Sequence, residues 1–254
     1  MHGRVVEWLG SRIATGHLTG VLDLDKIVQE FQVSRSLVRE CLRTLAAKGM
    51  VQARQRTGTS VTDPEHWALL DEQVIRWRAA GPKRFVQMQE SLELRLCLEP
   101  FAARSQAERR DPESLARLQD AARRIGEAIE ADSGPLMIQA DTAFHRELYL
   151  GSGNSMLARL AGTVHGCLRV PDFQEYRTFS SDTAYRHQHL ADAISAGDSE
   201  RAEQETQAMT ELTVTIFHNA YKMALEDYRA AAAQHTSRVS VPGARVLPGA
   251  EQLS

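Results

Sequence analysis

One aspartate and two histidines have the residue types and spacing that suit metal chemistry. Asp141 and His145 are four residues apart, so on a helix they share one face and can be aimed at one point. His187 lies in a later segment of the same half of the chain. A carboxylate and two imidazoles that converge inside a helical bundle could hold a divalent metal with coordination positions left open. The plainer alternative is a set of surface residues or of hydrogen-bonded core residues.

Arg95 is a charged side chain in an apolar setting, with Leu94 and Leu96 on either side of it. A bound carboxylate would explain a charge at this place, because an arginine can hold a carboxylate through two parallel hydrogen bonds. An ion pair with Glu99, one helical turn further on, explains it equally well. The residues alone leave both explanations open.

The segment 34–48 carries a second pattern, which suits a polyanion. Ser34 is a good helix N-cap. Arginines recur at every fourth residue and form a basic stripe: Arg35, Arg39 and Arg43. Apolar residues at spacings of three and four form a separate stripe that can be buried. Such a helix can meet phosphates and base edges, although an ordinary amphipathic helix with a solvated basic face has the same pattern.

Charge is unevenly distributed along the 254 residues, whose formal net charge is −3. Residues 1–62 hold nine Lys or Arg and five Asp or Glu, so they carry a net charge of +4, and the remainder carries −7. A basic block inside an acidic protein indicates a local polyanion site. The chain has no apolar run long enough to cross a bilayer and no apolar signal core, so we expect a cytoplasmic protein.

The cysteines indicate a reducing compartment. Cys41, Cys97 and Cys167 are odd in number and far apart, and each falls in an apolar helical pattern. We therefore expect three buried free thiols and no disulfide.

Two further helices must position the basic stripe. Residues 4–16 predict a first helix, and a short second helix capped by Asp23 or Asp25 ends at the break Gln32–Val33. With the helix over 34–48 they form a helix-turn-helix pattern. Two β-prone segments then surround a glycine-bearing turn, and a hairpin in this position is a wing.

Residues 4–62 resemble the winged helix-turn-helix of GntR-family transcription regulators. The resemblance is carried by Ile13-Ala14-Thr15-Gly16, Phe31-Gln32-Val33-Ser34-Arg35-Ser36-Leu37-Val38-Arg39-Glu40, Leu42-Arg43-Thr44-Leu45-Ala46-Ala47-Lys48-Gly49-Met50-Val51 and Gly58-Thr59-Ser60-Val61. It implies that Ser34, Arg35, Ser36 and Arg39 contact DNA from the start of the recognition helix and that Gly58 marks the tip of the wing. We also expect DNA contacts from Arg43, Arg54 and Thr59, the two arginines by neutralising phosphates. The sequence departs from the family at Asp25, where some members carry an arginine, and at Thr19-Gly20, where Pro-Gly is usual.

From Phe85 to about His235 the sequence is almost entirely helical in pattern. The expected helices are separated by short breaks and cover 83–108, 112–132, 135–151, 154–170, 181–197 and 198–234. Short loops between them predict an antiparallel all-α bundle. The expected fold is mainly α, with four parts: a winged helix-turn-helix over 1–63, a linker helix over 64–82, a helical effector domain over 83–235 and a disordered tail over 236–254. Trp67, Leu70, Val74 and Trp77 are expected on one face of the linker helix.

Residues 85–225 resemble the FCD effector domain of the FadR subgroup of this family, through Glu93-Leu94-Arg95, Glu99-Pro100, Asp141-x-x-x-His145, Gly153-Asn154 and Arg186-His187. Members often bind zinc or nickel through one Asp and three His. Asp141, His145 and His187 occupy the first three places, but the fourth place holds Met209, and a thioether is a poor zinc ligand. The resemblance therefore implies a weakened metal site or a lost one.

The resemblance also favours Arg95 as the anchor of an effector carboxylate, with Arg169 and Asn154 as further effector-binding candidates. The linker stretch Trp67-Ala68-Leu69-Leu70-Asp71 is similar to that of regulators that respond to sugar acids such as galactonate.

The sequence thus predicts a homodimeric DNA-binding regulator that binds a palindromic operator, and not an enzyme. We expect it to repress transcription until a small carboxylate binds and relieves the repression. Two alternatives remain. One is a regulator that senses an acyl-CoA or another ligand without metal, and the other is an enzyme that uses the Asp/His/His cluster with a metal.

Overall fold

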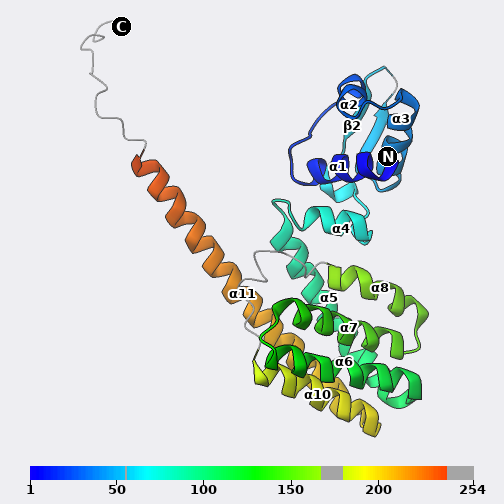
Figure 1. Cartoon of the computed structure of the whole chain (residues 1–254), viewed down its shortest axis with the longest axis vertical. Coiled ribbons are helices and arrows are strands. Elements are labelled where there is room, and N and C mark those ends of the chain that lie inside the picture. The colour runs from blue at the N-terminus through cyan, green and yellow to red at the C-terminus, as the bar shows by residue number, and fades with distance from the viewer. Residues whose placement is uncertain (55, 167–179, 239–254) are drawn as a thin grey trace, which may run out of the picture.

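The computed structural model describes residues 1–54, 56–166 and 180–238. An N-terminal winged helix and a C-terminal helical bundle are joined by a short linker that includes one helix (Figure 1). The mainly α fold predicted from the sequence is confirmed. None of the helices in the described part of the chain combines the length and apolar character needed to cross a bilayer.

The winged helix consists of α1 (His2–Ala14), α2 (Leu24–Phe31), α3 (Arg35–Ala47), β1 (Val51–Arg54) and β2 (Gly58–Val61). Asp23 caps α2 by accepting hydrogen bonds from two backbone amides of the first turn. Ser34 caps α3 by accepting the amide hydrogen of Leu37 at 3.2 Å. The two strands pair antiparallel, with Val51 opposite Val61 and Arg54 opposite Gly58. The helix-turn-helix and the wing lie where the sequence predicted them.

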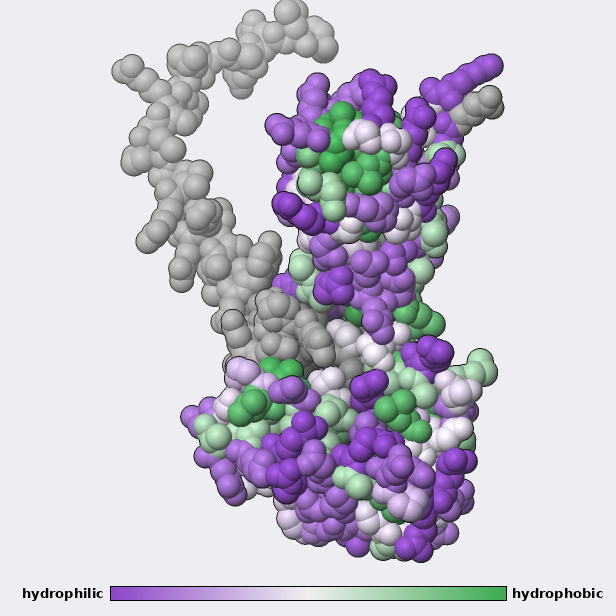
Figure 2. Space-filling model, turned by 45° about the vertical axis from the view of Figure 1, so that its right-hand side comes forward, coloured by the Kyte–Doolittle hydropathy of each residue, from purple (hydrophilic) through white to green (hydrophobic). Residues whose placement is uncertain are grey.

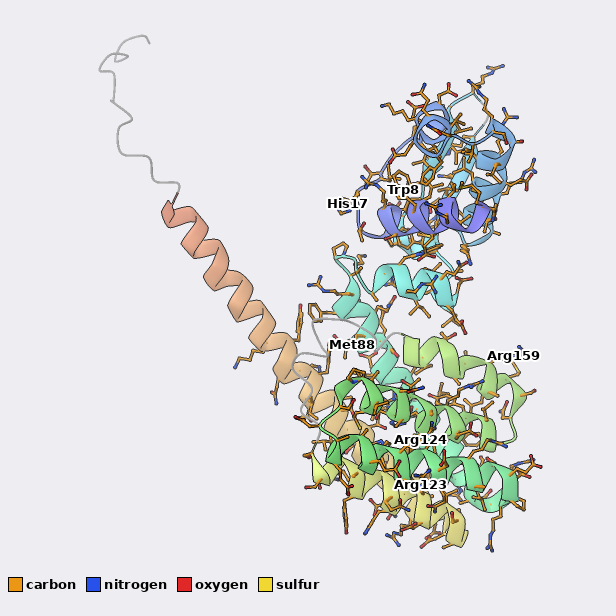
Figure 3. All side chains as sticks on the ribbon, in the orientation of Figure 1. Trp8, His17, Met88, Arg123, Arg124 and Arg159 are labelled. Atoms are coloured by element: carbon orange, nitrogen blue, oxygen red, sulfur yellow. The ribbon has the colours of Figure 1, made fainter. Side chains whose placement is uncertain are left out.

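A compact apolar core holds the winged helix together. Its fully buried members come from α1 and α3 and from the residues that follow α3, and include Leu9, Val38, Cys41, Leu45 and Met50. At the edge of this core Trp8, which is labelled in Figure 3, lies on α1. Its ring packs edge-on against that of Phe31, with ring centroids 5.1 Å apart. The core fixes α3 with its arginine stripe facing outward.

The linker differs from the prediction of a single helix. It contains a one-turn 3-10 helix (Pro64–His66), an extended stretch and then α4 (Glu72–Arg78). Asp71 stops the helical pattern from running through, because its side chain caps α4 by accepting the amide hydrogens of Gln73 and Val74. Trp67 and Trp77 are buried as expected, but Leu70 is 58% exposed.

The bundle contains α5 (Arg84–Arg109), α6 (Pro112–Glu130), α7 (Gly134–Gly151), α8 (Ser155–Gly166), α10 (Ser181–Ala196) and α11 (Ser199–Arg238). Helix α5 packs along α11, and α6 lies between α7 and α10. The bundle core is built on large buried side chains such as Phe144, Leu118 and Leu190. Helix α11 continues past the bundle in Figure 1.

Two smaller expectations need correction. Cys41 is buried, but Cys97 is exposed because it lies on the outer face of α5; Cys167 lies outside the described residues. The predicted tail starts too early, since α11 is helical as far as Arg238. The rest of that tail, residues 239–254, lies outside the described part of the chain.

Candidate DNA interface and effector pocket

The recognition helix α3 presents its arginines to solvent. Arg35, Arg39 and Arg43 are all exposed, as are Ser34 and Ser36 at the start of the helix. The hydroxyls of Ser34 and Ser36 are 2.8 Å apart. These small side chains let the positive end of the helix approach an anion closely. The structure therefore places the predicted contact residues of α3 on one accessible surface.

Two of these arginines already have acidic partners. Nη2 of Arg35 is 2.7 Å from Oδ1 of Asp25, on α2. Arg43 pairs with Glu40 one turn earlier on α3. Arg39 forms no ion pair within the described residues, so among the three it is the one with an uncompensated charge.

The wing supplies the other predicted contacts. Arg54 and Gly58 lie opposite each other where the hairpin turns, and both are exposed. Gly58 has φ +87°, a conformation that side chains rarely adopt, so the turn requires a glycine at this place. Thr59 is half-buried, so its side chain is less available than that of Arg54, and its backbone carbonyl accepts the amide hydrogen of Leu22 at 2.8 Å.

In the bundle, the structure brings Asp141, His145 and His187 together. One candidate ligand atom from each lies within 4.8 Å of the others, and all three residues are buried. Oδ1 of Asp141 is 3.7 Å from Nε2 of His145 and 3.4 Å from Nε2 of His187. The convergence predicted from the i, i+4 spacing and the later histidine is therefore confirmed, between α7 and α10.

The tautomer of His187 can be inferred from its neighbours. Its Nδ1 lies 2.7 Å from the carbonyl oxygen of Thr183, which can only accept, so Nδ1 carries the proton. Its other ring nitrogen, Nε2, lies 3.4 Å from Oδ1 of Asp141 and makes no hydrogen bond among the described residues. An imidazole held in this way by a backbone carbonyl is the usual arrangement of a metal ligand.

Arg95 and Glu99 join this buried polar cluster from α5. Two nitrogens of Arg95 donate to the two carboxylate oxygens of Glu99, at 2.8 and 3.0 Å. Both side chains are buried. The ion pair that the sequence offered as one explanation of Arg95 is therefore present. Nη2 of Arg95 also lies 3.1 Å from Nε2 of His145.

Electrostatics keep the pocket's arginine charged and its histidine neutral. Burial alone would lower the pKa of Arg95, but the adjacent Glu99 carboxylate raises it above the ordinary value. Burial lowers the pKa of His145, and the Arg95 charge lowers it further against the opposing pull of Glu99. A neutral imidazole can act as a metal ligand, and a charged guanidinium can bind an anion.

The sequence did not single out two other polar residues near this cluster, Tyr149 and Thr210, and it named Glu99 only as a partner of Arg95 and as part of a family motif. Oε2 of Glu99 lies 3.3 Å from Nδ1 of His145, and the hydroxyl of Thr210 on α11 donates to the same oxygen at 3.4 Å. Tyr149 lies one turn beyond His145, is buried, and has its pKa raised by burial and then by Glu99. The continued spacing of four from Asp141 through His145 to Tyr149 was a usable signal.

The remaining predicted site residues lie in different places. Met209 is buried in the bundle core on α11, next to Thr210 in the chain. Asn154 is exposed and caps α8, with its Oδ1 accepting the amide hydrogens of Met156 and Leu157 at 3.0 and 3.1 Å. Arg169 lies outside the described residues.

A winged helix-turn-helix with an exposed arginine stripe, joined to a bundle with a buried polar cluster, defines a ligand-responsive DNA-binding regulator. Residues 2–61 match the sequence model of bacterial regulatory proteins of the gntR family, and residues 90–212 match that of the FCD domain. The chain belongs to the GntR family, and it is a transcription regulator rather than an enzyme.

Curated relatives agree with this assignment. The chain is 30% identical over 214 residues to the HTH-type regulator YieP of Escherichia coli, covering 81% of this chain and 90% of YieP. It is 34% identical over 184 residues to LutR of Bacillus subtilis, covering 70% and 81%. It is 28% identical over 216 residues to the galactonate operon transcriptional repressor of Escherichia coli, covering 81% and 92%.

Solved structures share the fold. Lar of Listeria monocytogenes has a TM-score of 0.58 at 18% identity, covering 87% of this chain and 97% of that one. A Streptococcus agalactiae GntR protein has a TM-score of 0.50 at 21% identity, covering 85% and 99%.

Proposed function

We propose that this regulator is a homodimeric repressor of the FadR subgroup that releases its operator when a small carboxylate, such as a sugar acid, binds in the bundle. The observation that carries the proposal is the buried meeting of Arg95 with Asp141, His145 and His187. The FCD match supports the subgroup, and the galactonate operon repressor supports the sugar-acid class.

DNA is bound by α3 and the wing in this proposal. Ser34, Arg35, Ser36 and Arg39 contact the major groove, because they lie exposed in the first turns of the recognition helix. Arg43 and Arg54 neutralise phosphates, while Gly58 and Thr59 shape the wing. Arg39 is the strongest candidate for a direct contact, since its charge has no acidic partner in the described structure.

A divalent metal such as zinc or nickel fits the donor set in part. Asp141, His145 and His187 would hold it, and the feature that supports this role is Nε2 of His187, which is buried beside Asp141 without a hydrogen bond among the described residues. The ion would supply positive charge for an effector carboxylate or hydroxyl. Met209 cannot act as a fourth hard ligand, so effector or water oxygens would have to complete the coordination.

Effector binding changes the partners of Arg95. Its guanidinium is committed to Glu99 and lies against His145. An incoming carboxylate competes with Glu99 for this arginine, and the exchange shifts α5 against α7 and α11, which all contribute to the pocket. A ligand shifts the equilibrium between the two arrangements of the helices only by as much as its affinities for those arrangements differ.

Two hydrogen bonds connect α5, which carries Arg95, to the linker. On α5, the hydroxyl of Ser91 donates to the carbonyl of Val164 on α8 at 2.8 Å. Thr163, the preceding residue, donates to the carbonyl of Leu70 in the linker at 3.0 Å. We propose that a displacement of α5 reaches the winged helix through these bonds.

The homodimer is proposed from an exposed apolar stripe. Leu94 and Phe101 on α5 are 42% and 53% exposed, and Met156 at the start of the neighbouring α8 is 80% exposed. Hydrophilic side chains cover most of the bundle face seen in Figure 2, with small apolar patches between them. A second copy would cover the stripe, and its two-fold symmetry would match a palindromic operator.

A substitution on this stripe tests the dimer. Phe101→Asp should convert the protein to a monomer in light scattering and weaken operator binding. Tyr185→Asp is the control, because Tyr185 is also exposed, at 57%, but lies on α10. A Phe101→Asp protein that stays dimeric would place the interface elsewhere.

A thermal-shift panel tests the effector. Sugar acids and other small carboxylates are added with and without zinc or nickel, because a ligand that binds the native state raises the midpoint. A shift that requires both acid and metal supports the metal-bridged pocket. A shift with acid alone assigns recognition to Arg95 without metal, and a shift only with acyl-CoA overturns the small-carboxylate proposal.

A further inference from the structure

Asp25 is an acidic residue on a surface that must meet phosphates. It lies in the first turn of α2, and its Oδ1 is 2.7 Å from Nη2 of Arg35, the first residue of the recognition helix. The two side chains are 59% and 68% exposed, respectively, so the pair is accessible to DNA. A carboxylate at this place weakens the attraction between the protein surface and DNA phosphates, so its presence calls for a physical explanation.

The fold does not supply that reason. Asp23, not Asp25, caps α2 through its Oδ1. An exposed ion pair contributes little to stability, because water screens it and two long side chains must be ordered. The pair does, however, link two helices rather than two turns of one helix, so it fixes the guanidinium of Arg35 relative to the body of the domain.

We infer that Asp25 is a positioning residue for DNA recognition: by holding Arg35, it orients the guanidinium towards a guanine in the operator half-site. This inference rests on the proposed role of α3 in the major groove. A guanidinium that is oriented beforehand loses less side-chain freedom on binding. Its remaining nitrogens can donate to O6 and N7 of guanine, a geometry that other bases do not match.

The inference separates affinity from base selection. The carboxylate repels phosphates on every sequence equally, but it orients Arg35 for one base pair. Loss of the carboxylate should therefore leave or raise the overall affinity for DNA while lowering the preference for guanine at one position.

The test is selection of bound duplexes from a random DNA pool, followed by sequencing. It uses the full-length wild type, Asp25→Asn, Arg35→Ala and the double variant. Glu30→Gln is the matched control, because Glu30 is exposed on the same helix and its loss removes the same charge. Thermal melting of each variant checks that the fold is kept.

We expect Arg35→Ala to lose one guanine position of the selected motif. Asp25→Asn should lower the preference at that same position by about tenfold, which corresponds to about 1.4 kcal/mol, without loss of total DNA binding. The double variant should be no worse at that position than Arg35→Ala, and Glu30→Gln should keep the wild-type motif.

Two other results would be decisive. If Asp25→Asn keeps the full guanine preference while Arg35→Ala loses it, Asp25 is an ordinary surface partner and the inference is wrong. If Arg35→Ala also keeps the whole motif, the assignment of α3 to the major groove fails instead.

Discussion

Lys48, which ends the recognition helix, forms an ion pair with Asp71, which begins α4, and Nζ of Lys48 lies 2.6 Å from Oδ2 of Asp71. The backbone reinforces the junction, because the carbonyl of Lys48 accepts the amide hydrogen of Ala68 at 2.9 Å. Asp71 also caps α4 through its other carboxylate oxygen. One side chain therefore connects the DNA-binding helix to the linker.

Replacing Asp71 should destabilise the protein in a pH-dependent way. Burial alone would raise the pKa of Asp71, but Lys48 and the two capping amides hold it below the ordinary value. The carboxylate therefore contributes stability that is present above its unfolded pKa and is lost as the pH falls through the lower folded pKa. We expect Asp71→Ala to cost roughly 1–2 kcal/mol near neutral pH, measured by urea unfolding.

The same measurement at acidic pH provides the check. The difference between wild type and Asp71→Ala should shrink as the pH falls below the ordinary pKa of an aspartate. Asp63→Ala, an exposed linker aspartate without a side-chain cap, is the control and should stay close to wild type. A penalty for Asp71→Ala that does not change with pH would contradict the assigned role of its charge.

The buried pair of Arg95 and Glu99 predicts a second effect. Arg95→Met or Glu99→Leu alone should cost about 3–5 kcal/mol, because each leaves a buried charge without its partner. Replacing both, as Arg95→Met with Glu99→Leu, should cost less than either single change. Urea unfolding of the three variants measures this.

Arg104→Met is a suitable control for that series, since Arg104 lies on the same helix and pairs with Glu108 and Glu203 at the surface. It should unfold close to wild type. A double variant that is as unstable as the sum of the single changes would mean that the pair is not the source of the penalty.

Gly49 predicts a third effect, at the turn after the recognition helix. Its φ is +73°, and a Cβ there would lie 2.0 Å from the carbonyl oxygen of His66. Gly49→Ala should therefore destabilise the protein by more than about 2 kcal/mol, from both backbone strain and a clash. Gly126→Ala is the control, because a Cβ at this helical position meets nothing within 4 Å and should stabilise by about 0.5–1 kcal/mol. The free energy of unfolding is measured by thermal or urea denaturation. A Gly49→Ala protein that is as stable as Gly126→Ala would contradict the described turn.

Local sequence signals predicted most of the elements. The apolar spacing of α3, the cap at Ser34 and the glycine at the wing gave both the position and the orientation of the recognition helix. Each of these signals depends only on residues that are close in the sequence, so it can be recognised without knowledge of the fold.

The failures have a common physical cause. The spacing of the apolar residues from Trp67 to Trp77 is that of one helix. The side chain of Asp71 nevertheless caps a helix that begins within this segment, so the helix does not extend back to Trp67. Apolar spacing alone does not show where such a cap forms. Tyr149 and Thr210 lie near the buried polar cluster only because α5, α7 and α11 pack together. Their places are set by tertiary contacts, which a single sequence does not state.

Met209 predicts a gain of function. If Asp141, His145 and His187 hold a divalent ion, a histidine at residue 209 supplies the fourth nitrogen or oxygen ligand that a closed zinc site needs. Met209→His should tighten zinc or nickel binding by at least about tenfold, because imidazole is a far better ligand than a thioether for these ions. Isothermal titration calorimetry of protein prepared without metal measures the change.

Leu212→His is the control, because Leu212 is partly exposed on the same helix and the substitution adds a histidine outside the buried cluster. Equal metal affinity in Met209→His and wild type would show that residue 209 does not face the cluster, and a gain in Leu212→His of the same size would assign the effect to an adventitious surface site.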